Sequence, residues 1–350
     1  MFNSKTLFIF GAGASKEAGL PTGNELTATI ANMLDIKFDD DLTLISGDRV
    51  IYQALQRHVH EADGQGGDIY SYQQAGWLIS NAMPQASSID SFIDAHQGDE
   101  KVTLCGKLAI VRSILEAERN SSLFFDDRQR DAKLSFANLQ ETWYERFFRL
   151  LVDGSPKGNV YNLFDNVSFI IFNYDRAVEH FLFNAVQNYY NIEPDEAADL
   201  LNRALRLFHP YGFVGHLPWQ TDTDSIPFGS AIQGAGLLSH AGIIMTYSER
   251  IEDETAITAL HRLLIDAETI VFLGFAFHNQ NMMLMKSSAP NNLERVFATA
   301  IGISSSDLDI VGQQITDVFG KNDDQFRIEL RQGLSCYQLF DEYSRTLSQL

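Results

Sequence analysis

A short apolar run followed at once by a glycine-rich turn is the feature that most constrains this chain. Residues 7–10 read Leu-Phe-Ile-Phe and end at Gly11, which is typical of a central strand in a parallel sheet, buried on both faces. The segment 11–23, GAGASKEAGLPTG, is dominated by small side chains. Such a turn lets backbone N–H groups approach a pyrophosphate at a helix N-terminus, or it simply allows tight packing of strand against helix.

The glycine-rich segment departs from two common nucleotide-binding patterns. The dinucleotide pattern Gly-x-Gly-x-x-Gly needs glycine at the position of Lys16, and the P-loop pattern Gly-x-x-x-x-Gly-Lys-[Ser/Thr] does not occur in the chain. The turn is therefore a phosphate-binding candidate outside the usual dehydrogenase and P-loop classes.

Three further apolar runs, 167–172, 269–273 and 295–301, are each followed by a turn and a helix-like pattern, as in successive βα units. Residues 50–155 show apolar side chains at helical spacing instead. We therefore predict an α/β fold, a Rossmann-like doubly wound parallel sheet with a helical insertion subdomain. The predicted core comprises residues 1–48 and 160–350, and the insertion comprises 49–159. Helices are expected at 304–319 and 341–350, and a loop-rich excursion at 210–240.

Composition excludes several classes of protein. The formal net charge is −20 at pH 7, and this excess of carboxylates repels a phosphate backbone, so we expect no direct nucleic-acid partner. Only Cys105 and Cys336 are present, which excludes a four-thiolate zinc site and favours a reducing, cytoplasmic location. The N-terminal apolar run of about five residues is shorter than a signal-peptide core or a membrane span, so we expect no membrane partner.

Polar side chains follow two of the strand-like segments. Asn173 and Asp175 come directly after the run 167–172, and ligands of open α/β sheets bind outside the carboxyl ends of strands. Asn173 could hold a water or a ribose hydroxyl, and Asp175 could accept from an amide; alternatively, Asp175 caps a helix over 176–185. His209 follows Leu207-Phe208 and could serve as a general base, although any of the nine histidines is more often a surface or core residue.

The run 269–273 ends in Gly274-Phe275. A glycine there permits close backbone approach to a ligand, but it also suits an ordinary βα turn.

Four motifs follow one another along the chain: GAGAS with GLP, then FNYD, then His209 before a glycine-bearing turn, and then GFAF. Taken together and in this order, they resemble the sirtuin superfamily, and most of all the sirtuin-like domains of bacterial anti-phage defence proteins. The resemblance covers residues 1–35 and 165–300. It implies NAD+ as the substrate, without a metal. It implies catalytic roles for Asn173, beside the nicotinamide ribose, and for His209. The NAD contacts that it implies are Gly11, Ala12, Gly13, Ser15, Leu20, Pro21, Asp175, Gly274 and Phe275.

The chain departs from deacetylating sirtuins in informative ways. Leu20-Pro21 is followed by Thr22-Gly23 rather than a Phe-Arg pair, both Cys-x-x-Cys zinc pairs are missing, and Pro210 replaces the glycine that usually follows the histidine. The resemblance therefore implies an NAD+ glycohydrolase (NADase) rather than a deacetylase. In that family the outcome is NAD+ depletion after activation, an abortive-infection form of antiviral defence.

The resemblance also implies control by assembly. We expect a homo-oligomer, or a partner such as a HerA-type ATPase or another defence-system protein. Two other functions stay open: a non-catalytic sensor that binds NAD or ADP-ribose and signals to a partner protein, and transfer of ADP-ribose to a protein.

Overall fold

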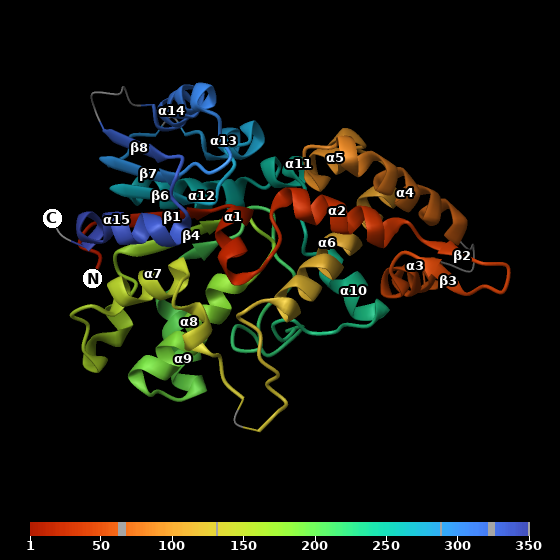
Figure 1. The fold of residues 1–350 in the computed structure, drawn as a ribbon, viewed down its shortest axis with the longest axis horizontal. Coiled ribbons are helices and arrows are strands. Elements are labelled where there is room, and N and C mark those ends of the chain that lie inside the picture. The colour runs from red at the N-terminus through yellow and green to blue at the C-terminus, as the bar shows by residue number, and fades with distance from the viewer. Residues whose placement is uncertain (62–67, 131, 288, 321–325, 349–350) are drawn as a thin grey trace.

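The computed structural model describes residues 1–61, 68–130, 132–287, 289–320 and 326–348. Six strands form one parallel sheet (Figure 1) in the order β5-β4-β1-β6-β7-β8. They are β1 (Thr6–Phe10), β4 (Val167–Ile171), β5 (Leu207–Phe208), β6 (Thr269–Leu273), β7 (Arg295–Thr299) and β8 (Arg327–Arg331). Counted along the chain within this sheet, the order is 3-2-1-4-5-6, which is that of doubly wound dinucleotide-binding folds. The predicted fold class is confirmed.

Strand β1 lies in the middle of the sheet and is buried along its whole length. It pairs with β4 and β6, so that Phe8 lies opposite Phe169 and Val271. Phe8 and Phe10 enter the core on one face of the sheet, and Leu7 and Ile9 enter the core on the other. Because both faces are covered, the strand is continuously apolar instead of alternating.

Helices cover both faces of the sheet (Figure 1). The face that receives Phe8 and Phe10 is covered by α7 (Trp143–Val152), α8 (Ala177–Tyr190), α9 (Pro194–Ala204) and α15 (Cys336–Ser348). The opposite face is covered by α12 (Glu254–Asp266), α13 (Asn279–Met285) and α14 (Ser305–Phe319).

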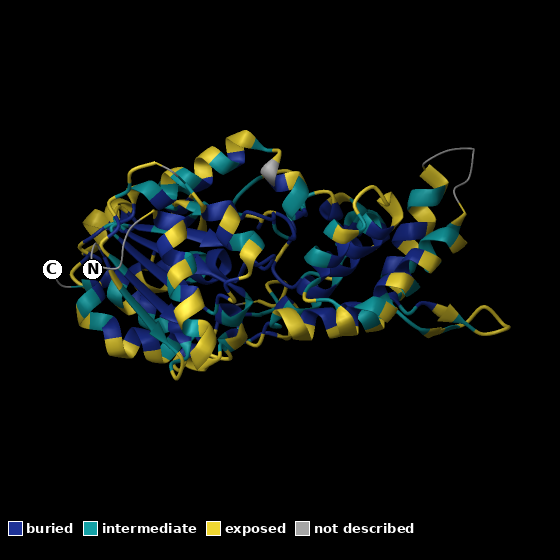
Figure 2. Ribbon diagram, turned by 90° about the horizontal axis from the view of Figure 1, so that it is seen from above, coloured by how far each residue is buried: buried dark blue, intermediate teal, exposed yellow. Residues whose placement is uncertain are grey.

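A group of helices at one end of the molecule forms what we call the helical lobe (Figures 1 and 2). It consists of α2 (Gly23–Leu34), α3 (Arg49–Glu61), α4 (Ile69–Ala82), α5 (Ile89–Ala95), α6 (Glu100–Asn120) and α10 (Gly234–Ala241), with a hairpin of β2 (Lys37–Phe38) and β3 (Leu44–Ser46). Its apolar interior is continuous with one face of the sheet.

The segment 49–159, predicted as an insertion, contains helices and 3-10 turns and no strand among its described residues. Its parts pack in two places. Helices α3–α6 join the lobe with α2 and α10, which come from outside the segment, whereas α7 packs on the sheet beside α15. The remaining short elements are α1 (Ala12–Ser15), α11 (Tyr247–Ile251) and the 3-10 turns η1 (Lys16–Ala18), η2 (Met83–Gln85), η3 (Phe136–Leu139) and η4 (Lys157–Asn162).

Boundaries differ from prediction where tertiary contacts intervene. Helix α14 occupies almost the predicted span, but α15 begins at Cys336 rather than at 341. The carboxylate of Glu17 accepts the backbone N–H of Tyr337, which satisfies an orphan donor at the start of this helix. The edge strand β8, RIELR, is half-exposed and carries charged side chains, so it lacks the continuous apolar run that predicts a buried strand.

No helix in the described part of the chain has the length and apolarity needed to span a membrane.

Candidate functional site

Four chain segments meet at the carboxyl edge of the sheet, after β1, β4, β5 and β6. The strands are parallel, so their carboxyl ends share one edge. From β1 the chain continues to β4 and β5 on one side and to β6, β7 and β8 on the other. This reversal is the topological switch point at which open α/β sheets bind ligands.

The glycines of the first loop are needed for contact with the loop after β6. A Cβ on Gly11 would lie 2.5 Å from the Gly274 carbonyl oxygen, and Gly274 itself has φ +57°. The N–H groups of Gly11, Gly13 and Ala14 donate to the carbonyls of Leu273, Gly274 and Gly11. Three loop amides are therefore already satisfied within the protein, as expected for the tight-packing alternative. A pyrophosphate bound here would have to displace these carbonyls or use other donors.

Asn173, Ser15 and Asp175 form a buried hydrogen-bond network. The Asn173 side-chain amide donates to the Gly11 carbonyl oxygen and to Ser15 Oγ, both at 3.1 Å. Ser15 Oγ donates to Asp175 Oδ2 at 2.9 Å. Residues 160 positions apart are thus brought together by the pairing of β1 with β4.

Asp175 has two contacts at once. Its Oδ1 accepts the N–H of Ala177, the first residue of α8. Asp175 therefore satisfies one donor at the start of the helix, although the N-cap residue is Arg176 and not Asp175 as the alternative had it. Burial raises the pKa of its carboxyl to about 6, against the opposing effect of the hydrogen bonds from Ala177 and Ser15.

His209 lies just beyond β5, and both of its ring nitrogens face acceptors. Nδ1 is 3.1 Å from the main-chain oxygen of Asn173, and Nε2 is 2.9 Å from Glu179 Oε1. A carbonyl oxygen and a carboxylate can only accept. Both hydrogen bonds are made together when the ring carries two protons, or when Glu179 holds the proton on its side.

The remaining predicted contacts serve packing. Leu20 and Phe275 are buried in the two cores on opposite faces of the sheet, and Phe275 packs edge-on against Phe172 at 5.2 Å. Pro21 is half-buried just before α2, and Ala12 is half-buried at the start of α1. None of these four side chains can join the polar network, and the structure brings together Gly11, Ser15, Asn173, Asp175 and His209.

Sequence reasoning missed several residues that hold this edge in place. Glu179 binds His209, the Thr299 hydroxyl accepts the N–H of Gly274 at 2.8 Å, and Trp143 Nε1 donates to the Ala14 carbonyl at 2.8 Å. Only Glu179 had a usable signal. It is an acidic residue four positions after Asp175, in the first turn of the helix predicted over 176–185.

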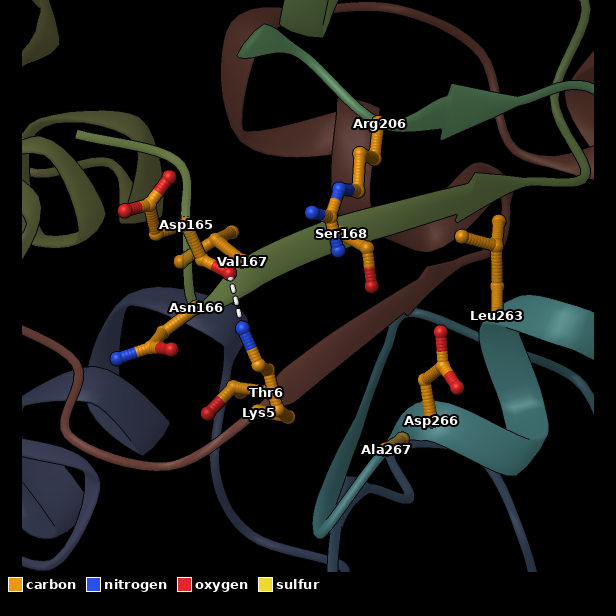
Figure 3. Close-up of a pocket in the computed structure, with 10 residues that line it drawn as sticks. All are labelled: Lys5, Thr6, Asp165, Asn166, Val167, Ser168, Arg206, Leu263, Asp266 and Ala267. Atoms are coloured by element: carbon orange, nitrogen blue, oxygen red, sulfur yellow. Dashed lines mark hydrogen bonds between the residues drawn. The ribbon is translucent and has the colours of Figure 1, made fainter. Parts of the chain in front are cut away.

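Two pockets lie away from this network. Figure 3 shows a pocket at the opposite, amino edge of the sheet, where Lys5 Nζ donates to the Asp165 carbonyl at 2.7 Å. A second, of about 150 Å³, lies between α5, α6 and α11. Neither is lined by Asn173, Asp175 or His209. The polar side chains of the candidate site are buried and hydrogen-bonded within the protein.

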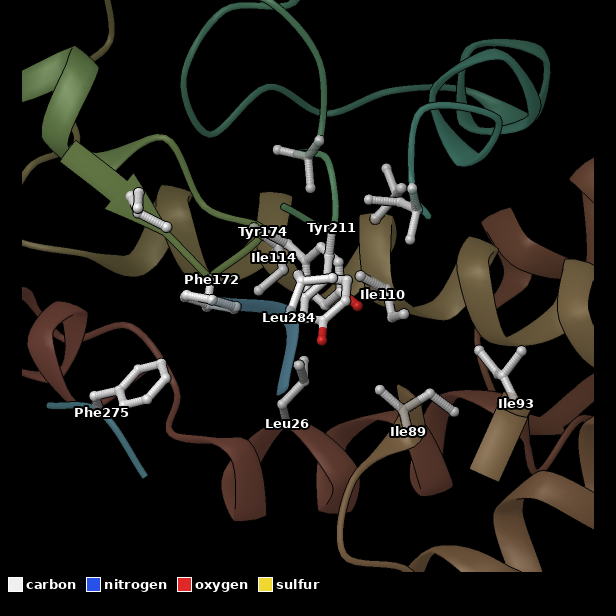
Figure 4. Close-up of a cluster of buried hydrophobic side chains, with 14 of the residues drawn as sticks. Leu26, Ile89, Ile93, Ile110, Ile114, Phe172, Tyr174, Tyr211, Phe275 and Leu284 are labelled. Atoms are coloured by element: carbon white, nitrogen blue, oxygen red, sulfur yellow. The ribbon is translucent and has the colours of Figure 1, made fainter. Parts of the chain in front are cut away.

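The helical lobe reaches the site through Tyr174, between Asn173 and Asp175. Its hydroxyl donates to Asp90 of α5, whose carboxyl pKa is raised by burial. Figure 4 shows Tyr174 and Tyr211 in an apolar cluster with Ile110 and Ile114 of α6. The lobe is thus joined by a hydrogen bond and by apolar packing to the segment that carries Asn173.

Cys105 and Cys336 are both free and buried. Within the described residues, no group of three or more His, Cys, Asp and Glu side chains could hold a metal ion.

No protein-family model matches this chain, and a comparison with curated proteins found no match in sequence.

Proposed function

We propose that this chain is an NAD+ glycohydrolase that cleaves NAD+ to nicotinamide and ADP-ribose. The observation that carries the proposal is the network at the switch point, where the Asn173 amide binds both Gly11 and Ser15. The segments nominated by the resemblance to sirtuin-like domains thus meet at the one edge where a doubly wound sheet binds nucleotides.

The reaction needs little acid catalysis. The nicotinamide leaving group is cationic in NAD+, and it departs with the electron pair of the glycosidic bond. The site has to orient the ribose and activate the water that forms the new bond to the anomeric carbon, as the general base does in glycoside hydrolysis. In this proposal Asn173 orients the ribose or the water, and His209 accepts the water proton.

The closed site supports an activation step before turnover. Ser15, Asn173, Asp175 and His209 are each at least nine-tenths buried and are bonded to one another or to their neighbours. We propose that self-association, or binding of a partner such as a HerA-type ATPase, moves the helical lobe through the Tyr174–Asp90 contact and opens the site. The expected consequence is NAD+ depletion in antiviral defence.

The test is incubation of the purified chain with NAD+, alone and co-expressed with its genomic neighbours, followed by chromatography of nicotinamide and ADP-ribose. Release is expected in at least one assembled form and is expected to disappear in His209→Ala. His60→Ala, on the exposed surface of α3, is the matched control. Full release by His209→Ala and Asn173→Ala together would overturn the assignment.

A non-catalytic sensor of NAD or ADP-ribose is the second candidate. It is favoured by the contacts that both His209 ring nitrogens make within the protein, because neither nitrogen is then free to take a proton from water. The sensor predicts saturable NAD+ binding by calorimetry with no nicotinamide released in any assembled form. Radiolabelled ADP-ribose attached to protein would instead indicate a transferase.

A further inference from the structure

Glu179 lies in the first turn of α8, and its carboxylate is buried against His209. The Glu179 and His209 side chains are 1% and 3% exposed, and the Nε2 to Oε1 distance is 2.9 Å. The second oxygen of Glu179, Oε2, is buried and has no hydrogen-bond partner. An ionised carboxylate in this position is costly unless a positive charge lies beside it.

The nearby guanidinium of Arg176 is bound by another carboxylate. Its Nε and Nη2 donate to Glu118 at 3.0 and 2.6 Å, and its Nη1 donates to two carbonyls. The hydrogen-bonded partner of Glu179 is the His209 ring. Nε2 of His209 therefore faces the Glu179 carboxylate.

We propose that Glu179 is a positioning residue that fixes the Nε2–H tautomer of His209 and leaves Nδ1 as the basic nitrogen. The inference deepens the proposed function and rests on it for its catalytic consequence. Its physical basis is the difference between the two acceptors. Nε2–H donates to a carboxylate, in a charge-assisted bond, whereas Nδ1–H donates to a neutral carbonyl at 3.1 Å. Charge-assisted bonds are roughly twice as strong, so the neutral ring keeps its single proton on Nε2.

This tautomer places the base beside the residue predicted to orient the ribose. Nδ1 adjoins the main-chain oxygen of Asn173, and the Asn173 side chain contacts the loop after β1. In the hydrolytic step, after the proposed opening of the site separates Nδ1 from the Asn173 main-chain oxygen, Nδ1 takes one proton from water as the water oxygen bonds the ribose anomeric carbon and the bond to nicotinamide breaks. The carboxylate of Glu179 stabilises the imidazolium that results.

The test compares wild type with Glu179→Gln and with a control, Glu196→Gln, which removes an exposed carboxylate from the first turn of α9. Steady-state NAD+ cleavage is measured in the active assembled form. Glu179→Gln is expected to lower kcat about 10- to 100-fold, as loss of an orienting partner does, and to change KM by less than about threefold. The control is expected to match wild type.

The second readout is nitrogen NMR of the histidine rings in 15N-histidine protein without NAD+, with His209 assigned through the signal missing in His209→Ala. Wild type is expected to show a protonated Nε2 across the measured pH range, and Glu179→Gln is expected to lose that preference. This readout does not depend on turnover.

The outcomes separate the two proposals. If no wild-type assembly cleaves NAD+, the glycohydrolase proposal fails, while the NMR comparison still decides the tautomer. An unprotonated Nε2 in wild type would overturn the positioning role, as would wild-type kcat in Glu179→Gln. The wild-type spectrum decides the matter even if Glu179→Gln does not fold.

Discussion

Two buried pairs, Arg176–Glu118 and His209–Glu179, involve residues at the start of α8, and they differ in how completely their hydrogen-bonding atoms are satisfied. In one, Arg176 and Glu118 are fully buried, and the two Glu118 oxygens also accept N–H groups of Arg176 and Gly229. In the other, Glu179 binds His209 with one oxygen and leaves the second without a partner.

The difference teaches how a structural pair can be told from a candidate functional one. Arg176 joins α6 to the segment around Gly215 and Ile226, binding a carbonyl at each. Its guanidinium cannot release its proton in a protein, whereas a histidine can. The arginine pair therefore holds chain segments together, and the histidine pair is able to move a proton.

The strongest test of the difference between the two pairs is to replace each carboxylate in turn. Glu118→Gln leaves an arginine charge buried without its counter-charge, and we expect a loss of about 3–5 kcal/mol in the free energy of unfolding. Glu179→Gln is expected to cost only about 1 kcal/mol, the usual net value of one hydrogen bond, because it leaves no permanently charged group without a partner. Urea unfolding at pH 7 measures both. Equal losses in the two variants would show that the pairs do not differ in kind.

Asn173→Ala tests whether the network around His209 is where the proposed reaction takes place. It removes the amide that binds Gly11 and Ser15, and we expect kcat for NAD+ cleavage to fall about 100- to 1000-fold, as for loss of one oriented transition-state donor. Asn120→Ala, at the exposed end of α6, is the control. Unchanged kcat in Asn173→Ala would move the chemistry elsewhere.

Asp175 gives a pH-dependent prediction. Its pKa is about 6 in the folded chain against 3.8 ordinarily, so the native state binds this proton more tightly than the unfolded state. Its stabilising effect is present below about pH 4 and is lost as the pH rises through 6.

Asp175→Asn stays neutral throughout, so its stability relative to wild type is expected to rise between pH 4 and 7, by on the order of 3 kcal/mol. Denaturant unfolding at several pH values measures this, with the exposed Asp195→Asn as control. A constant difference between Asp175→Asn and wild type would contradict the raised pKa.

A further stability prediction concerns Thr299, which supports the loop after β6. Thr299→Val keeps the shape of the side chain but leaves the Gly274 N–H without its hydroxyl acceptor, at a cost of about 1–3 kcal/mol. Thermal unfolding is compared with that of Thr255→Val, an exposed threonine in α12. Equal melting temperatures would mean that this contact does not hold the loop.

Local pattern was enough to predict the elements that frame the site. The apolar runs that became β1, β4, β6 and β7 were visible because buried parallel strands are apolar on both faces. Strand β5 has only Leu207 and Phe208, which is too short to give a periodic signal. Strand β8, Arg-Ile-Glu-Leu-Arg, alternates charged and apolar residues, so it lacks the continuous apolar run that marks the other strands, and its only signal is the period of two typical of a half-buried strand. The glycines at 11 and 274 were singled out separately, but their contact with each other was not foreseeable from either turn.

The sequence by itself determined the fold class and the polar residues that end the strands, because local apolarity and turn chemistry report burial and backbone conformation. Only the tertiary structure decided which of those residues meet and what they meet. It showed the tight contact of two glycine turns and the Glu179–His209 pair across 30 residues. It also showed that Arg176 is bound by Glu118, 58 residues away. The physical reason is that hydrogen bonds and ion pairs between distant segments depend on how helices and strands pack in space, and no local periodicity records that arrangement.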